Sequence, residues 1–100
     1  MEQCTIVFAS KAQNEYEESV LWYLKKSEEV SLKFIVSLED TIQKIVKNPF
    51  INKNLYKRFY EINIKKYPFT IVYVIDKKEI IIISIYHQKR NPKYKISKKK

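Results

Sequence analysis

The sequence predicts an α+β domain with the element order β-α-α-β-β-β, in which an N-terminal helical hairpin packs on a small, mostly antiparallel, twisted sheet. Two amphipathic helical patterns in the first half, three β-branched and aromatic segments in the second half, and a short apolar segment before the helices support this prediction. The 100 residues suffice for one hydrophobic core. We therefore expect a single domain over residues 1–96 and a basic C-terminal tail over residues 97–100.

The first strand and helix are predicted over residues 5–26. Thr5 to Ala9 is short, apolar and β-branched, and Ser10 with Gln13 forms a capping-box pattern for a helix start. We expect this helix to end near Lys26. Its core-facing stripe follows spacings of three and four residues, through Ala12, Tyr16, Val20 and Tyr23 or Leu24.

A second helix follows after a very short break. Ser27 is a suitable N-cap, Glu28 and Glu29 favour the first turn, and Asn48-Pro49 should end the helix. The apolar stripe consists of Ile35, Leu38, Ile42 and Ile45. Two helices joined so closely are expected to form an antiparallel hairpin, and a sheet must cover their apolar stripes.

The second half of the chain predicts a three-stranded antiparallel meander. We expect a loop from Phe50 to Leu55, followed by strands over Tyr56 to Ile64, Phe69 to Ile75 and Glu79 to His87. The last of these is apolar on both faces from Ile80 to Ile83 and should be the most protected, central strand. Because the chain has no glycine, its turns should rely on Asn, Asp, Pro and Ser.

Charge is distributed very unevenly. Residues 1–50 hold six Lys and eight acidic residues, or −2, whereas residues 51–100 hold twelve Lys, two Arg and three acidic residues, or +11. Such a field attracts anionic partners, which could be nucleic acid, an acidic protein, or both. The single Cys4 excludes an internal disulfide and a multi-cysteine metal site, and no apolar run reaches about 18 residues. We expect a cytoplasmic protein without cofactor, metal ion or membrane partner.

Several short motifs resemble the RelE/ParE superfamily of plasmid-stabilisation-type toxins, over nearly the whole chain. They are Trp22-Tyr23, Asn48-Pro49, Arg58, the strand Tyr67-Pro68-Phe69 to Tyr73, and His87-Gln88-Lys89-Arg90-Asn91-Pro92. The resemblance implies the toxin of a bacterial type II toxin-antitoxin module. Its partner would be a cognate antitoxin whose acidic segment wraps the toxin, and operator DNA would be bound only through their complex.

The resemblance leaves two activities open, of which we expect growth arrest by ribosome-dependent mRNA cleavage through the basic sheet surface, with gyrase poisoning as the alternative. RelE-like members are metal-independent endoribonucleases that cleave ribosome-bound mRNA, whereas ParE-like members poison DNA gyrase and lack nuclease activity. The His-Gln-x-x-x-Pro pattern after the last strand is nearer to ParE-like members. A third possibility is a catalytically inactive, basic regulatory module.

For RNA cleavage, a base must act on the ribose hydroxyl and cations must stabilise the developing charge. The candidates are Arg58, His87 and Arg90, provided that the fold brings them together. Each also has a structural alternative. His87 would bond a neighbouring backbone group, Arg58 would form an exposed cross-strand ion pair, and Arg90 would pair with an acid such as Glu61.

Further basic and aromatic residues are candidates for binding RNA or another target. They are Lys53, Lys57, Lys65, Lys66, Lys89, Lys93 and Tyr94. The lysines would provide phosphate affinity and the tyrosine a stacking surface, together with Tyr67 and Tyr86 unless these two pack in the core. Taken one at a time, each lysine is better explained as part of a solvated surface, whereas the charge asymmetry as a whole is not.

Overall fold

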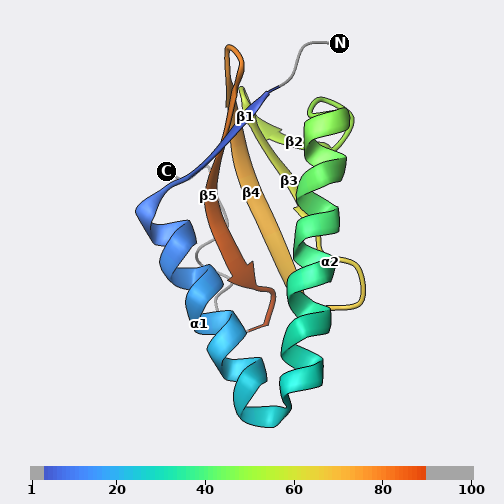
Figure 1. The fold of residues 1–100 in the computed structure, drawn as a ribbon. Coiled ribbons are helices and arrows are strands. Elements are labelled where there is room, and N and C mark those ends of the chain that lie inside the picture. The colour runs from blue at the N-terminus through green and yellow to red at the C-terminus, as the bar shows by residue number, and fades with distance from the viewer. Residues whose placement is uncertain (1–3, 90–100) are drawn as a thin grey trace.

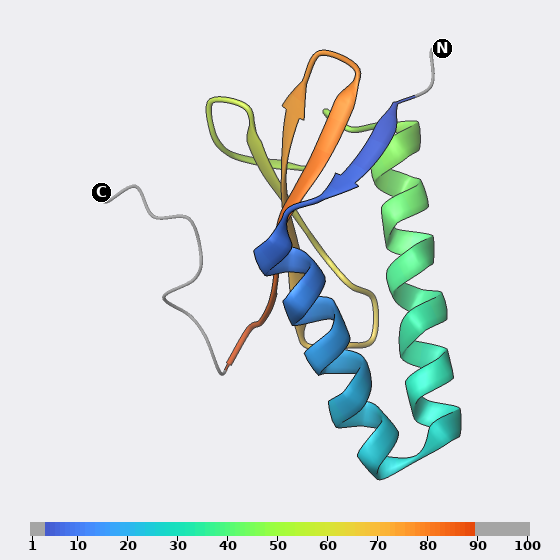
Figure 2. The ribbon, with the colours of Figure 1, turned by 60° about the vertical axis from the view of Figure 1, so that its left-hand side comes forward.

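The computed structural model describes residues 4–89, which form two helices and a five-stranded sheet. The elements are β1 (Thr5–Phe8), α1 (Ser10–Lys26), α2 (Glu28–Lys47), β2 (Lys53–Tyr56), β3 (Phe59–Asn63), β4 (Phe69–Asp76) and β5 (Glu79–His87). The strand order is β1-β5-β4-β3-β2, with β1 parallel to β5 and every other pair antiparallel. The helical hairpin lies against one face of this sheet (Figures 1 and 2). The predicted α+β class is confirmed.

The helix ends test the capping predictions. Helix α1 ends at Lys26 as predicted, but the capping box is wrong: Ala9 occupies the N-cap position and makes no side-chain cap hydrogen bond. Ser10 is already the first helical residue, so its side chain is one position too late to cap the helix. Ser27 does cap α2, because its hydroxyl oxygen accepts a hydrogen bond from the backbone N–H of Val30 at 3.3 Å.

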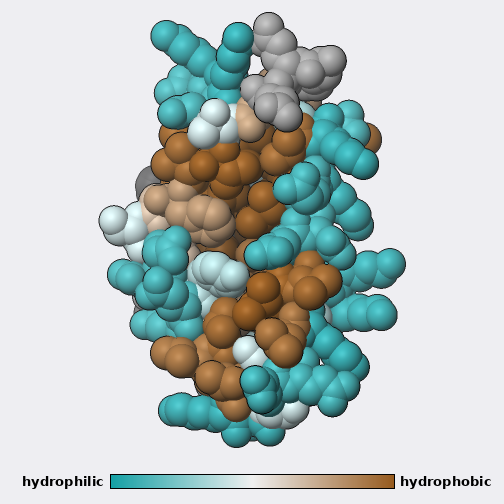
Figure 3. Space-filling view, viewed as in Figure 1, coloured by the Kyte–Doolittle hydropathy of each residue, from teal (hydrophilic) through white to brown (hydrophobic). Residues whose placement is uncertain are grey.

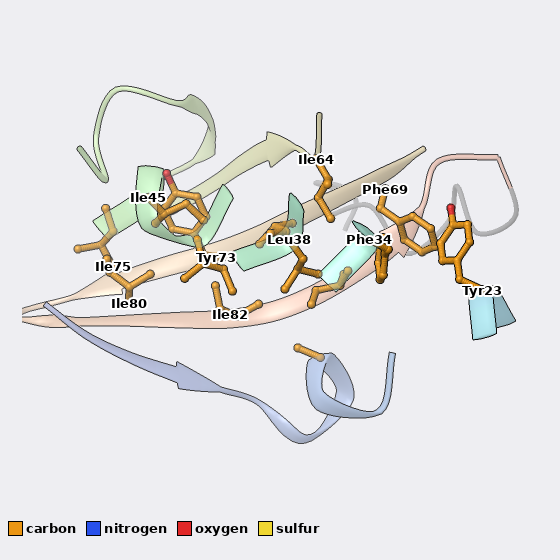
Figure 4. Packing of buried hydrophobic residues seen from close by; sticks show 14 residues of the cluster. Tyr23, Phe34, Leu38, Ile45, Ile64, Phe69, Tyr73, Ile75, Ile80 and Ile82 are labelled. Atoms are coloured by element: carbon orange, nitrogen blue, oxygen red, sulfur yellow. The ribbon is translucent and has the colours of Figure 1, made fainter. Parts of the chain in front are cut away.

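The helices bury an aromatic cluster against the sheet. Tyr23 rather than Leu24 completes the stripe of α1, and Leu24 remains 46% exposed. On α2 the side chain of Phe34 is fully buried, whereas the predicted Ile35 is only half-buried. Tyr23, Phe34 and Phe69 gather at one end of the core, with ring centroids 4.8 to 6.2 Å apart (Figure 4). These contacts fasten the closed end of the hairpin to the start of β4.

The sheet differs from the prediction in two respects. Strand β2 occupies Lys53–Tyr56, mostly within the predicted loop, and a two-residue turn at Lys57 and Arg58 separates it from β3. The central strand is β4 rather than β5, because β1 and β5 lie on one side of it and β3 and β2 on the other. The register of β4 and β5 shifts between Val72 and Tyr73, so Ile82 and Ile85 both pair with residues on the helix-facing side.

Lysines take the left-handed backbone positions of three turns. Lys57, Lys66 and Lys77 have φ values of 50°, 73° and 58°. Our expectation that Asn, Asp, Pro and Ser would form the turns is therefore wrong at these three positions. A non-glycine residue with positive φ is strained by its Cβ atom, at a cost of about 1 kcal/mol or more. Because the chain has no glycine, the strand pairing on either side must hold these residues in place.

Candidate functional site

His87 ends β5 on the side of the sheet that faces α1. Its ring packs edge-on against Phe69, with centroids 5.1 Å apart, and its Nδ1 atom accepts a hydrogen bond from the backbone N–H of Lys89 at 3.1 Å. In the neutral ring the proton therefore resides on Nε2. A pocket of about 200 Å³ lies beside it, lined also by Glu15, Glu18 and Trp22. His87 thus lines a pocket together with two carboxylates of α1.

Arg58 lies in the two-residue turn between β2 and β3 rather than on a strand. Its Nη1 atom is 3.3 Å from Oδ1 of Asp76, the last residue of β4, and both side chains are exposed. Its carbonyl oxygen accepts a hydrogen bond from the backbone N–H of Ile75 at 3.3 Å. This geometry corresponds to an exposed ion pair, a class worth about 0.2–1 kcal/mol.

Arg58 and His87 lie at opposite ends of β4. Arg58 adjoins Ile75, whereas His87 pairs with Phe69. Phe69 and Ile75 are six positions apart along β4, which is about 20 Å at ~3.3 Å per residue. The two side chains do not share a site. Arg90, Lys93 and Tyr94 lie outside the described residues, as does the predicted tail over residues 97–100.

The other candidate lysines divide between the same two ends. Lys57 joins Arg58 at the end where the β4–β5 turn lies, whereas Lys65 and Lys66 in the β3–β4 turn and Lys89 after β5 lie at the end of His87. Lys53 is between them on β2, 3.7 Å from Glu61 on the face that the helices leave uncovered. Within residues 51–89, the candidate basic residues therefore lie mostly at the two ends of β4, with Lys53 between them.

Comparison with known proteins decides the family. The model of the family described as ParE toxin of the type II toxin-antitoxin system, parDE, matches residues 6–92. The chain belongs to the ParE toxin family. It is thus a type II toxin of the RelE/ParE superfamily, and an antitoxin is its expected partner.

Solved structures share the fold of this ParE-family toxin. The chromosomal ParDE toxin-antitoxin system from P. aeruginosa contains a chain with 17% identity and a TM-score of 0.72, covering 85% of this chain and 96% of that one. The isolated E. coli RelE toxin has 22% identity, a TM-score of 0.61 and coverages of 91% and 90%. A chain of the YoeB dimer from Staphylococcus aureus has 20% identity and a TM-score of 0.60, and the match covers 86% of this chain and 99% of that one. No curated protein sequence matches significantly.

The described residues of this ParE-family toxin include no helix that is long and apolar enough to cross a membrane. Within the same range, no group of three or more His, Cys, Asp or Glu side chains is arranged to hold a metal ion.

A polar network at the end of β5 was not foreseen from the sequence. The Thr70 hydroxyl donates to Oδ1 of Asn63 at 2.7 Å, and Nε2 of Gln88 donates to the same oxygen at 3.2 Å and to the Thr70 hydroxyl at 3.1 Å. The network joins β3 and β4 to the residue after β5. The only sequence feature that could have indicated this network was Gln88, which belongs to the His87-Gln88 motif.

Glu61 is a second unforeseen feature, on the same face as this network. Its side chain is 12% exposed, and Oε1 has no hydrogen-bond partner among residues 4–89. Burial raises the pKa of the neighbouring Tyr86, the hydrogen bond with Thr70 lowers it, and the charge of Glu61 raises it further. Tyr86 is therefore buried and neutral. Of the two roles considered for it, base stacking and core packing, the structure agrees with core packing.

Glu15 closes the edge of β5 beyond the point where β1 ends. Strand β1 pairs only with residues 79–82. Farther along, Oε1 of Glu15 on α1 accepts hydrogen bonds from the backbone N–H of Ile85 at 2.8 Å and from the Ser84 hydroxyl at 3.0 Å. A helix carboxylate thus satisfies a strand N–H that would otherwise lack a partner.

Proposed function

We propose that this ParE-family toxin arrests growth by binding and poisoning DNA gyrase, without ribonuclease activity. The separation of Arg58 from His87 carries the proposal. Cleavage of RNA needs a proton acceptor and cations around a single phosphate. Here Arg58 is paired with Asp76, and His87 lies near carboxylates of α1 at the other end of β4. The match to the ParE family supports the same activity.

Ribosome-dependent mRNA cleavage is the second candidate. The net charge of +9 favours it, since a strongly basic protein binds nucleic acid readily. In that case His87 or Lys89 would act with residues beyond position 89, such as Arg90 and Tyr94. The experiment below includes this activity as an alternative outcome.

The decisive experiment measures both activities with the same purified toxin. Gyrase, supercoiled DNA and ATP are incubated with the chain, and trapped gyrase–DNA cleavage complexes are measured after detergent treatment. In parallel, the 5′ ends of mRNA are mapped in a translating extract. We expect cleavage complexes and unchanged mRNA ends. New mRNA ends without gyrase complexes would overturn the proposal in favour of RNA cleavage, and neither product, with no growth arrest, would favour the regulatory module.

The antitoxin is the second partner that we propose for this toxin. We expect a neighbouring reading frame to encode a short DNA-binding protein with an acidic tail. Co-expression of that protein should restore growth to cells that express the toxin. The pair, and not the toxin alone, should bind the operator DNA in a gel-shift experiment.

A further inference from the structure

A groove lies between α2 and the β3–β4 turn, at the opposite end of β4 from Arg58, and neither Arg58 nor His87 lines it. Its volume is about 430 Å³. Leu32 and Val36 form an apolar wall on α2, where they are 57% and 58% exposed. Ser37, Lys65, Lys66 and Tyr67 form the other boundaries. We name this feature the α2 groove.

The α2 groove is held in shape by contacts on both sides. The Ser37 hydroxyl donates to the carbonyl oxygen of Lys65 at 3.0 Å, which fastens the turn to the helix. The Tyr67 ring packs edge-on against the buried Phe34, with centroids 5.3 Å apart, and against Tyr23 at 5.6 Å. A partner would therefore bind a surface that is already ordered, and little conformational entropy would be lost on the toxin side.

The charges around the groove favour an acidic partner. Lys65 and Lys66 are exposed, and neither forms an ion pair within the described part of the chain. Lys33 adds a third positive charge, weakened by its exposed pair with Glu29 at 3.4 Å, and Asp40 is the one acidic lining residue. An apolar wall with a positive rim is complementary to a segment that carries an apolar side chain flanked by Asp or Glu.

A second exposed apolar patch offers no such complementarity. Leu21, Trp22 and Leu24 are exposed on α1, and the depression beside them, with a similar volume of about 460 Å³, is lined by residues of this helix alone. Its charged residues, Glu18 and Lys25, balance each other. Figure 3 shows apolar side chains along the helical face with hydrophilic side chains at its margins. Of these two apolar regions, the α2 groove is the one that is lined by both α2 and the β3–β4 turn, and its charged residues are mostly positive.

We propose that the α2 groove docks an acidic segment of the cognate antitoxin. An apolar side chain of that segment packs against Leu32 and Val36, and its carboxylates lie beside Lys65 and Lys66. The inference rests on the proposed function in one respect only, the presence of an antitoxin, and is independent of whether gyrase or mRNA is the target. Its test therefore measures antitoxin binding without either target.

The apolar wall is tested with a matched pair of leucines. Leu32 and Leu21 are both helical and both 57% exposed, so Leu32→Glu and Leu21→Glu introduce the same change at equal exposure. Binding of the purified antitoxin to each full-length variant is measured by calorimetry, with circular dichroism as the folding control. We expect Leu32→Glu to weaken binding at least tenfold and Leu21→Glu to change it less than twofold. Equal effects, or none, would overturn the proposal.

The positive rim is tested with a matched pair of lysine turns. The double variant Lys65→Glu with Lys66→Glu reverses the charge at the groove, and Lys77→Glu with Lys78→Glu does the same at the β4–β5 turn. We expect the first to weaken antitoxin binding at least tenfold in low salt, with a smaller difference in high salt, and the second to have a much smaller effect. Equal losses would indicate attraction to net charge and would contradict a specific site.

Two further readouts separate other occupants of the groove. In cells, Leu32→Glu should still arrest growth, but the antitoxin should no longer relieve the arrest. A variant that loses growth arrest and keeps its antitoxin affinity would make the groove a target-binding surface. A change from dimer to monomer in the isolated toxin, measured by ultracentrifugation, would assign the groove to a second copy of the chain. Either result would overturn the proposal.

Discussion

At the residue scale, Tyr73 joins the loop before β2 to the central strand. Its side chain is fully buried, its hydroxyl donates to the carbonyl oxygen of Pro49 at 2.7 Å, and the side-chain amide of Asn52 donates to the hydroxyl at 2.9 Å. The ring also stacks on Tyr60 with centroids 5.7 Å apart. One side chain thus fixes the path of the chain from the end of α2 to β2.

We therefore expect Tyr73→Phe to lower the free energy of unfolding by about 1–3 kcal/mol, because the Pro49 carbonyl and the Asn52 amide lose a buried partner. Urea denaturation measures the change. Tyr56→Phe is the matched control, since this tyrosine is half-exposed on an edge strand and its loss of a hydroxyl should cost less than about 0.5 kcal/mol. Equal stabilities of the two variants would contradict this role for Tyr73.

The candidate site illustrates what a sequence can predict about single residues. The side-chain types of His87 and Arg58 marked them, from the sequence alone, as a candidate acid-base group and a candidate phosphate ligand. Their neighbours were not, since the ion pair with Asp76 and the carboxylates near His87 depend on strand register and helix position. Lysines with positive φ were equally unforeseeable, because side-chain preference is overridden there by strand pairing.

At the element scale, a single residue forms the connection in the helical hairpin. Ser27 ends α1 with its backbone N–H, bonded to the carbonyl oxygen of Tyr23 at 3.0 Å, and begins α2 with its hydroxyl. We expect Ser27→Ala to destabilise the fold by about 1 kcal/mol through the lost cap. Ser10→Ala, which removes a hydroxyl without a cap hydrogen bond, should have a much smaller effect in thermal unfolding. A larger loss for Ser10→Ala would contradict the assigned capping roles.

Both helices were predictable because their signals are local: each has a 3.6-residue apolar period, and α2 also has the Ser27 cap and the stop at Asn48-Pro49. Strand β2 was not, since its residues are mostly exposed and lack alternation, and it exists only through pairing with β3. The central place of β4 was also hidden. The order of strands depends on which edges β1 and β2 occupy, and no apolar pattern within a single strand encodes that choice.

At the scale of the whole molecule, buried tyrosines couple stability to alkaline pH. Burial raises the pKa of Tyr16, Tyr73 and Tyr86 above the ordinary value of 10.0; Glu39 adds to the shift of Tyr16, and hydrogen bonds oppose the shifts of the other two. A group whose pKa is higher in the folded state stabilises the fold fully below its unfolded pKa. That stabilisation is lost as pH rises from about 10 through the higher folded values.

We therefore expect the free energy of unfolding to fall as pH rises above 10. Tyrosinate absorbance at 295 nm should show at least three of the eight tyrosines ionising late in the folded toxin and at the ordinary pH in urea. A single shared midpoint in both states would contradict the inferred burial.

The uneven charge of the chain was visible in the sequence, but its division between the two ends of β4 required the fold.

The carboxylate of Glu15 also bears on how the toxin behaves at high concentration. Open strand edges recruit strands from other molecules and start aggregates. Beyond β1, the backbone N–H of Ile85 on the edge of β5 donates to the Glu15 carboxylate of α1. The two strands that form the edges of the sheet, β1 and β2, are each only four residues long. Short edges of this kind give a second molecule little to extend, so a strand-rich protein can accumulate without polymerising through its sheet.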